Sequence, residues 1–230
     1  MTPEAEIEAG IRQHADPVRA LDVKRYLKSD LAFLGAPVPM VRTAVRSAIA
    51  GRCPGLDRAA ALGLARSLWI SPLWELRLAA VEVLTARWAV LETGDLELVE
   101  ELLRSALTWA LVDPLSAEVA ARLFERDRAG GGSWLDRWAV DPNLWLRRAS
   151  LLTLLPGLRR GEGDFERFGR YADPMLEERD FFIRKAIGWV LRETGRRRPD
   201  VVRAWLGPRA ARASGLTLRE AVRHLPGHRL

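Results

Sequence analysis

The chain has 230 residues, 48% of them apolar and 29% charged, with a net charge of +6, so it is long enough to bury a core and is not expected to be disordered. One cysteine, Cys53, and three dispersed histidines exclude a disulfide framework and argue against a Cys- or His-based metal centre. Uncharged apolar runs fall short of the roughly 18 residues that span a membrane. The first residues also lack the apolar core of a signal peptide, so we expect a soluble, cytoplasmic protein with no membrane partner.

Helical periodicity dominates the chain. Apolar residues recur at three- and four-residue spacing, and no stretch shows the sustained alternation of a half-buried strand. Proline and glycine clusters divide this pattern into about twelve helices. Ser133 before Trp134 and Asp141 before Pro142 are typical of helix starts, and residues 130–133 are interpreted as a linker. In chain order, the expected breaks are 35–39, 51–55, 71–72, 93–94, 113–114, 130–133, 156–163, 195–199 and 207–208.

A short pattern repeats along the chain. Four segments share an aliphatic residue, then an arginine, an alanine two residues later and an aliphatic residue seven after the arginine. Their arginines, Arg42, Arg77, Arg147 and Arg184, are spaced by 35, 70 and 37 residues. A period of about 35 residues with two helices per period predicts an all-α, HEAT-like helical-repeat solenoid. We expect one curved domain over residues 1–230 with about six helix pairs, in which the repeated arginine bonds a neighbouring repeat or loop.

One copy of this pattern is missing near residue 112. There the chain reads Leu-Val-Asp113-Pro114, with Trp109 four residues before the aspartate. A carboxylate thus stands where the other segments have a base, and it would face the groove of an array lined by arginines. Alternatively, Asp113 followed by Pro114 fits a helix start with Asp113 as the N-cap.

Basic charge gathers toward the end of the chain. Residues 192–230 alone carry a net charge of +7, and 33 of the 36 basic residues are arginine. Because a guanidinium makes forked contacts to phosphate, this distribution favours a polyanion such as nucleic acid as partner. A solvated basic tail combined with an arginine-rich codon bias explains the charge equally well.

Several motifs are specific in combination. They are Tyr26-Leu-Lys28 with Phe33-Leu-Gly35 and Pro39; Thr108-Trp109-Ala-Leu-Val-Asp113; Asn143-Leu-Trp-Leu-Arg147-Arg148-Ala; Phe181-Phe-Ile-Arg-Lys185-Ala-Ile-Gly188-Trp189-Val-Leu-Arg192-Glu193; and Leu218-Arg-Glu-Ala221. Together they resemble the HEAT-repeat DNA alkylation repair glycosylases, the AlkD-like family, over about residues 20–225. The family often has Trp-Trp-Asp where this chain has Thr108-Trp109-Ala110, so the surroundings of Trp109 differ.

The resemblance implies a function and a set of site residues. The implied activity is excision of cationic N-alkylated purines, such as 3-methyladenine and 7-methylguanine, from double-stranded DNA without flipping the lesion into a deep pocket. The implied catalytic residues are Asp113, Trp109 and Trp189. The candidate DNA-binding residues are Arg148, expected on a phosphate, together with Tyr26, Lys185, Arg192 and Arg147.

The chemistry of these lesions suits such residues. Alkylation makes the base a cationic leaving group, and breaking its bond leaves an oxocarbenium-like sugar. Asp113 would stabilise that charge, and the faces of Trp109 and Trp189 would flank the sugar. Water is the nucleophile, so no metal or cofactor is expected.

Lys185 is the one lysine expected near the site and is assigned to the DNA backbone, which predicts a monofunctional enzyme. The other tryptophans are interpreted as core.

Two other classes of protein stay open. One is a non-catalytic HEAT-repeat protein that binds distorted or branched DNA, and the other is a HEAT scaffold for protein interactions. Salt-sensitive duplex binding would exclude the scaffold, and base release would identify the enzyme. We expect a monomer that associates with the nucleoid when it binds DNA.

Overall fold

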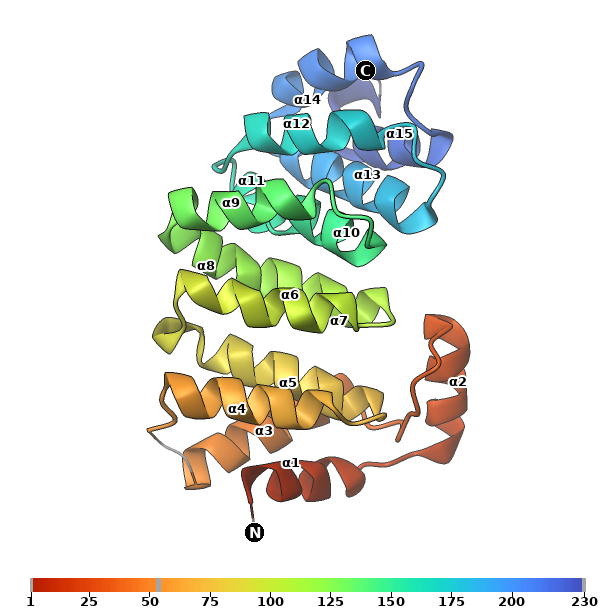
Figure 1. Ribbon diagram of the computed structural model, residues 1–230. Coiled ribbons are helices and arrows are strands. Elements are labelled where there is room, and N and C mark those ends of the chain that lie inside the picture. Colours follow the sequence, from red (N-terminus) through yellow and green to blue (C-terminus); the bar gives the residue numbers. More distant parts are fainter. Residues whose placement is uncertain (1, 53–54, 229–230) are drawn as a thin grey trace. The chain divides into compact units, whose positions relative to one another are not determined.

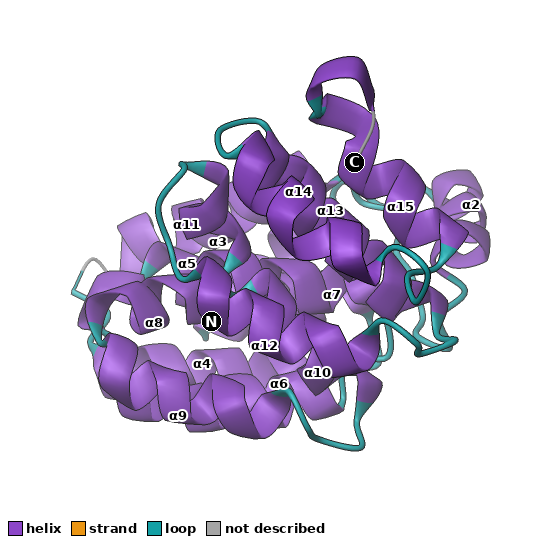
Figure 2. Cartoon of the chain, turned by 90° about the horizontal axis from the view of Figure 1, so that it is seen from above, coloured by secondary structure: helices purple, strands orange, loops and turns teal. Residues whose placement is uncertain are grey.

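Helices make up almost all of the regular structure (Figure 2). The computed structural model describes residues 2–52 and 55–228, so Cys53 lies outside the described residues. Within those ranges the β pairing is a single isolated bridge between Ala32 and Leu73. Among the helices of these ranges, none combines the length and the apolar character that a membrane span requires. The predicted all-α class is confirmed.

The chain divides into two compact units, Met1–Leu115 and Ser116–Leu230. Unit 1 contains α1 (Pro3–Arg12), α2 (Pro17–Leu27), α3 (Val38–Arg52), α4 (Arg58–Trp69), α5 (Trp74–Ala86), α6 (Leu96–Arg104) and α7 (Trp109–Pro114) (Figure 1). Unit 2 contains α8 (Ala121–Arg126), α9 (Arg128–Trp138), α10 (Leu144–Leu152), α11 (Leu155–Arg159), α12 (Phe165–Met175), α13 (Phe181–Gly195), α14 (Pro199–Leu206) and α15 (Gly215–Ala221). The expected single domain over residues 1–230 stays a prediction.

Small residues allow the helices of each unit to pack closely. The repeated alanines Ala79, Ala149 and Ala186 are fully buried, on α5, α10 and α13 respectively. Each offers a neighbouring helix a side chain of one methyl group, so the backbones approach and the surrounding leucines and valines fill the space between them. In these three repeats the alanine therefore marks the core face of its helix, whereas the fourth, Ala44 on α3, is only partly buried.

The repeated arginines connect helices to loops. In three of them the guanidinium donates a hydrogen bond to the carbonyl six residues earlier, in the loop before its own helix. The pairs are Arg77 with Ser71 at 2.9 Å, Arg147 with Asp141 at 2.7 Å and Arg184 with Glu178 at 2.7 Å. Arg42 instead donates to Glu82 of α5 at 2.8 Å. The expected structural role of this arginine is confirmed.

The glycine-rich run at 130–133 is helical, so its interpretation as a linker is wrong. α9 begins at Arg128, because Asp127 is its N-cap and accepts from the N–H of Gly130 at 2.9 Å. A Cβ on Gly131 would lie 2.9 Å from the Cα of Phe124, so glycine allows α9 to pack against α8. Close helix packing, rather than flexibility, explains this run.

The start of α10 also differs from the prediction by two residues. Asn143 is the N-cap and accepts from the N–H of Trp145 at 2.8 Å. Asp141 accepts from the N–H of Asn143 at 2.8 Å and so shapes the turn before the helix. Aspartate and asparagine both favour the N-cap position and the turn before a helix. Here Asn143, rather than Asp141, has the geometry of the N-cap.

Candidate functional site

The exposed helix α2 forms one border of the candidate site. Asp16 caps its start by accepting from the N–H groups of Val18 and Arg19, and Lys28 ends it with a left-handed φ of 49°. Figure 1 shows α2 standing to one side of the stacked helices α1, α3, α4 and α5. Its surface is mostly exposed, and its buried residue is Leu27. The position of α2 is therefore set by the segments at its ends together with the contact of its Tyr26 ring with Trp109.

Glu75 fixes the loop that follows α2. Its carboxylate is 1% exposed and accepts from the N–H groups of Leu34 at 3.0 Å and Gly35 at 2.7 Å. The carbonyl of Leu34 in turn accepts from the N–H of Asp16 at 2.9 Å, where α2 begins. Gly35 has a φ of +81°, which a residue with a side chain adopts only under strain. We call residues 28–37 the clamp loop, because they join α5 to the first turn of α2.

Asp113 lies inside α7, so its interpretation as an N-cap is wrong. Thr108 is the N-cap, and its hydroxyl accepts from the N–H of Ala110 at 3.4 Å. Pro114 has no N–H to donate to the carbonyl of Ala110. The helix does not stop there but continues as a wider π-helical segment, Leu115–Ala120. Such segments are rare and are often found at functional sites.

One cavity of unit 1 brings together Tyr26, Trp109 and Asp113. It has a volume of about 390 Å³. The rings of Tyr26 and Trp109 meet edge to face, with centroids 5.9 Å apart and planes at 83°. Asp113 lies one helical turn after Trp109 and is half-buried. The cavity is lined by Arg19, Val23, Tyr26, Leu27, Ala36, Val38, Arg42, Trp74, Glu75, Leu78, Trp109, Ala110, Asp113 and Pro114.

The lining residues that were not predicted as part of the site include Trp74, Glu75 and Arg19. Trp74, assigned to the core, is buried but also forms cavity wall and stacks against Phe33 with centroids 5.8 Å apart. Glu75 holds the clamp loop, which no local sequence pattern reveals. Arg19 lies four residues before Val23 and seven before Tyr26, which places all three on one face of a helix. That spacing is the sequence feature that could have identified Arg19 as a residue of the site.

In unit 2, Arg147 and Arg148 join α10 to the residues around the start of α13. Arg148 is 3% exposed and donates to the carbonyl of Phe182 at 2.6 Å. Arg147 donates to both carboxylate oxygens of Glu178 at 3.0 Å. These contacts give both guanidinium groups a structural role. Their predicted contacts with DNA stay predictions.

Lys185, Trp189 and Arg192 follow each other at four- and three-residue spacing, so they share one face of α13. Trp189 is half-buried. The Nζ of Lys185 lies 2.6 Å from a carboxylate oxygen of Glu220 on α15, and Arg192 donates to the other oxygen. A Cβ on Gly188 would lie 2.6 Å from the Cβ of Glu220, so glycine permits this close approach of α13 and α15. Glu220 therefore sets the positions of two predicted DNA-binding cations.

We expect Glu220→Gln to destabilise the protein by about 1–2 kcal/mol at pH 7, because it removes the charge from two charge-assisted hydrogen bonds. Burial raises the pKa of Glu220, but the hydrogen bond from Lys185 and the charges of Lys185, Arg192 and Arg223 outweigh it and lower the pKa. A lowered folded-state pKa means that this stabilisation is present above the ordinary pKa of glutamate and is lost as the pH falls through the folded-state value.

Urea unfolding of wild type and Glu220→Gln at pH 7 and at about pH 3 measures this effect. The stability difference between the two proteins should shrink at the lower pH. Glu166→Gln is the matched control, since Glu166 is an exposed acid whose ion pair with Arg170 spans 3.6 Å. Equal stability of the two variants at pH 7 would contradict the role given to Glu220.

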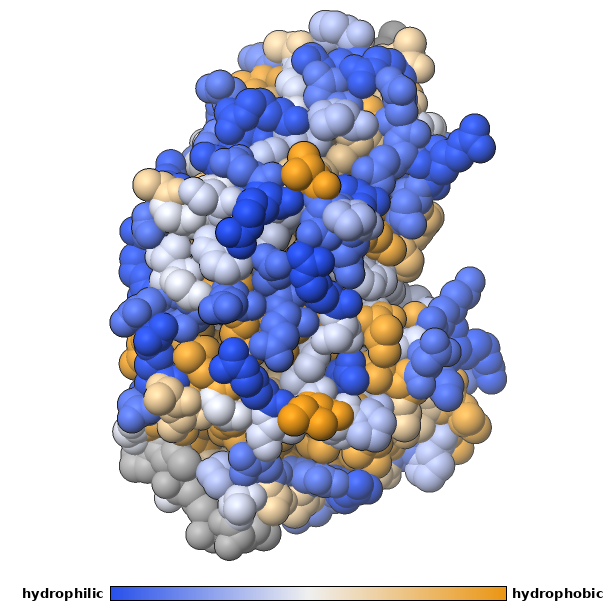
Figure 3. Space-filling view, in the orientation of Figure 1, coloured by the Kyte–Doolittle hydropathy of each residue, from blue (hydrophilic) through white to orange (hydrophobic). Residues whose placement is uncertain are grey.

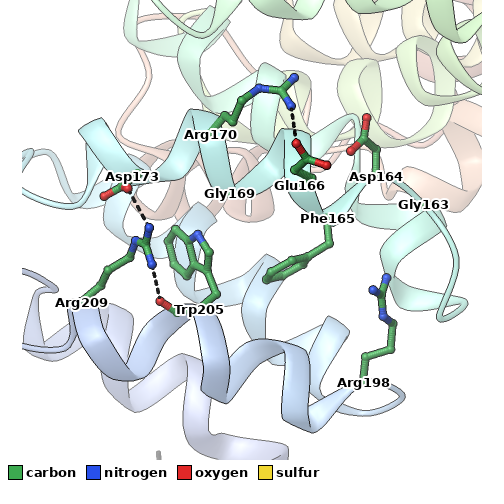
Figure 4. Close-up of a pocket in the computed structure, with 10 residues that line it drawn as sticks. All are labelled: Gly163, Asp164, Phe165, Glu166, Gly169, Arg170, Asp173, Arg198, Trp205 and Arg209. Atoms are coloured by element: carbon green, nitrogen blue, oxygen red, sulfur yellow. Dashed lines mark hydrogen bonds and ion pairs between the residues drawn. The ribbon is translucent and has the colours of Figure 1, made fainter.

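A second cavity lies within unit 2 and contains none of the predicted site residues. It has a volume of about 640 Å³ and lies between α12 and α14 (Figure 4). Its carboxylates are held by arginines: Asp164 by Arg167 at 3.1 Å, Glu166 by Arg170 at 3.6 Å and Asp173 by Arg209 at 3.0 Å. In the described part of the chain, no group of three or more metal-binding side chains gathers. Because the cavity of unit 1 contains Tyr26, Trp109 and Asp113 and the cavity of unit 2 contains no predicted site residue, the cavity of unit 1 is the candidate functional site.

The fold and this site define a helical-repeat protein that combines a carboxylate with aromatic rings. The chain belongs to the DNA alkylation repair enzyme family, whose model matches residues 7–225. The resemblance seen in the sequence motifs is thereby confirmed. Membership of this family supports an enzyme that acts in DNA alkylation repair and has DNA as its partner.

Two solved structures share the fold. A predicted DNA alkylation repair enzyme from Enterococcus faecalis has 17% sequence identity and a TM-score of 0.82, covering 92% of this chain and 97% of its own. The protein smu.31 from Streptococcus mutans UA159 has 16% identity and a TM-score of 0.62, covering 82% of this chain and 98% of its own. At these identities the likeness shows the fold alone. No curated protein matches the chain.

Proposed function

We propose that the protein is a monofunctional DNA glycosylase that hydrolyses the N-glycosidic bond of cationic alkylated purines in double-stranded DNA. The expected substrates are 3-methyladenine and 7-methylguanine. The observation that carries this proposal is the cavity of unit 1, where the carboxylate of Asp113 shares its lining with the rings of Tyr26 and Trp109. Family membership supports it independently.

The proposed mechanism depends on charge. A purine alkylated at N3 or N7 is already cationic, so it can leave without being protonated by the enzyme. Positive charge then develops on the sugar, and the carboxylate of Asp113 stabilises it while orienting the attacking water. The ring of Trp109 adds an attractive π face. Trp189 is also proposed to be catalytic, as the family resemblance implies. None of these steps uses a metal or a cofactor.

The basic side chains of unit 2 are proposed to bind the DNA backbone. Arg148, Lys185 and Arg192 are the candidates, with Arg147 as a further one. The ion pairs to Glu220 support this assignment for two of them, since they hold Lys185 and Arg192 on one face of α13. A lysine committed to the backbone forms no Schiff base, so the product is an abasic site in an uncut strand. The protein is proposed to act as a monomer in the cytoplasm.

The test is release of bases from duplex DNA treated with a methylating agent. Chromatography of the products should show free 3-methyladenine and 7-methylguanine, and untreated duplex should release neither. The strand should stay intact until alkali cleaves it at the abasic site. Salt-sensitive duplex binding without release would identify a non-catalytic DNA-binding protein. Absence of duplex binding would instead favour the protein-interaction scaffold.

A further inference from the structure

One face of α2 borders the cavity that contains Asp113. Arg19, Val23 and Tyr26 all line this cavity, and the same three residues line a second hollow of about 490 Å³ along α2. In Figure 3, hydrophilic side chains cover most of the visible surface over α2, with apolar residues at its border. The helix thus presents a cation, an aliphatic group and an aromatic ring to the candidate site, from a position outside the packed core of unit 1.

Arg19 differs from the other arginine of the cavity in its contacts. The guanidinium of Arg42 donates to Glu82 at 2.8 Å. Within the described residues, the guanidinium of Arg19 has no hydrogen bond or ion pair, and the contact of Arg19 with the cap Asp16 is made by its backbone N–H. It is also exposed. A cation at the edge of a cavity, with no internal partner and little desolvation to overcome, is available to a ligand.

We propose that Arg19 binds a phosphate of the damaged strand beside the nucleotide whose sugar lies at Asp113. This inference rests on the proposed function. The cavity carries the carboxylates of Asp113 and Glu75, which repel a polyanion as it approaches. A guanidinium on the bordering helix offsets that repulsion and binds phosphate oxygens through forked hydrogen bonds. Arg19 is therefore a positioning residue, and α2 is an arm that holds the strand over the cavity.

Arg25 provides a matched control on the same helix. It is exposed like Arg19, but it does not line the cavity and lies 3.4 Å from Asp22 in an ion pair. Replacing either arginine by glutamine removes one positive charge from α2. A general effect of net charge would appear equally in Arg19→Gln and Arg25→Gln, whereas a specific phosphate contact appears only in the first.

The experiment measures base release from methylated duplex, and duplex affinity across a range of salt, for wild type, Arg19→Gln, Arg19→Lys and Arg25→Gln. We expect Arg19→Gln to raise KM about tenfold with kcat changed less than about twofold. The slope of log affinity against log salt should decrease by about one unit. Arg19→Lys should recover part of the loss, and Arg25→Gln should resemble wild type. Equal melting temperatures confirm that no variant unfolds.

Two outcomes overturn the inference. If wild type releases methylated purines and Arg19→Gln matches Arg25→Gln in KM and salt slope, Arg19 binds no phosphate while the glycosylase proposal stands. If wild type releases no base, the proposed function fails, and the duplex affinities alone then test whether Arg19 binds a phosphate. Equal affinities of the two glutamine variants then overturn the role of Arg19, and a selective loss in Arg19→Gln supports it.

Discussion

Asp113→Asn is expected to lower the rate of base release by about a thousandfold, with duplex affinity and melting temperature close to wild type. Opposite charges about 4 Å apart gain roughly 4 kcal/mol at an effective dielectric constant near 20. Each 1.4 kcal/mol of transition-state stabilisation is worth about a factor of ten in rate. Asparagine keeps the shape of the side chain, so α7 should be preserved. Single-turnover release from methylated duplex, followed by chromatography, measures the rate.

The matched control for Asp113→Asn is Glu97→Gln, which removes a carboxylate from the exposed surface of α6 in the same unit. Its release rate should equal that of wild type. An unchanged rate in Asp113→Asn would remove this carboxylate from the chemistry. A large fall in its melting temperature would instead show that Asp113 has a structural role.

Gly35→Ala is expected to destabilise the protein by about 2–4 kcal/mol. Its φ of +81° disfavours any L side chain, and an added Cβ would overlap the carbonyl oxygen of Asp16 and lie 2.7 Å from the N of Ala20. The clamp loop and the first turn of α2 cannot both keep their positions. Urea unfolding measures the loss of stability, and base release should fall as well, because Tyr26 and Arg19 are displaced.

Gly63→Ala is the control for this effect. Gly63 lies inside α4, and apart from its chain neighbours and the backbone of its own helix, no heavy atom of the described residues lies within 4 Å of the Cβ that alanine would add. Since glycine is a poor helix former, this substitution should increase stability by about 0.5–1 kcal/mol. Wild-type stability in Gly35→Ala would contradict the conformation described for the clamp loop.

The fold was predictable because its signals are local and repeated. The three- and four-residue spacing of apolar side chains gives the helices, and the arginine and alanine of each repeat give the period. Arg77 and Arg184 bind carbonyls six residues earlier, which is a contact that a repeated motif can encode. The candidate site was predictable only from the family motifs. Tyr26 and Asp113 are too far apart in sequence for their spacing to show that they meet in one cavity.

The errors arose where tertiary contacts override local preferences. Glycines near residue 131 favour a linker locally, but the approach of Phe124 makes glycine necessary inside a helix. Asp113 before Pro114 has the pattern of a cap, but Thr108 caps the helix first and a π-helical segment accommodates the proline. Glu75 was missed because its partners lie forty residues earlier, in the clamp loop.

The way α2 is attached has a consequence for hydrogen exchange. We expect the contacts that hold its start, from Asp16 to Leu34 and from the clamp loop to Glu75, to break before the core of α5 unfolds, because α2 buries Leu27 alone whereas α5 buries most of its residues. Local opening of this kind costs less free energy than global unfolding. Amide protons of α2 should therefore exchange before those of α5. On this expectation, the cavity of Asp113 has one wall, formed by α2, that opens while the rest of unit 1 stays folded.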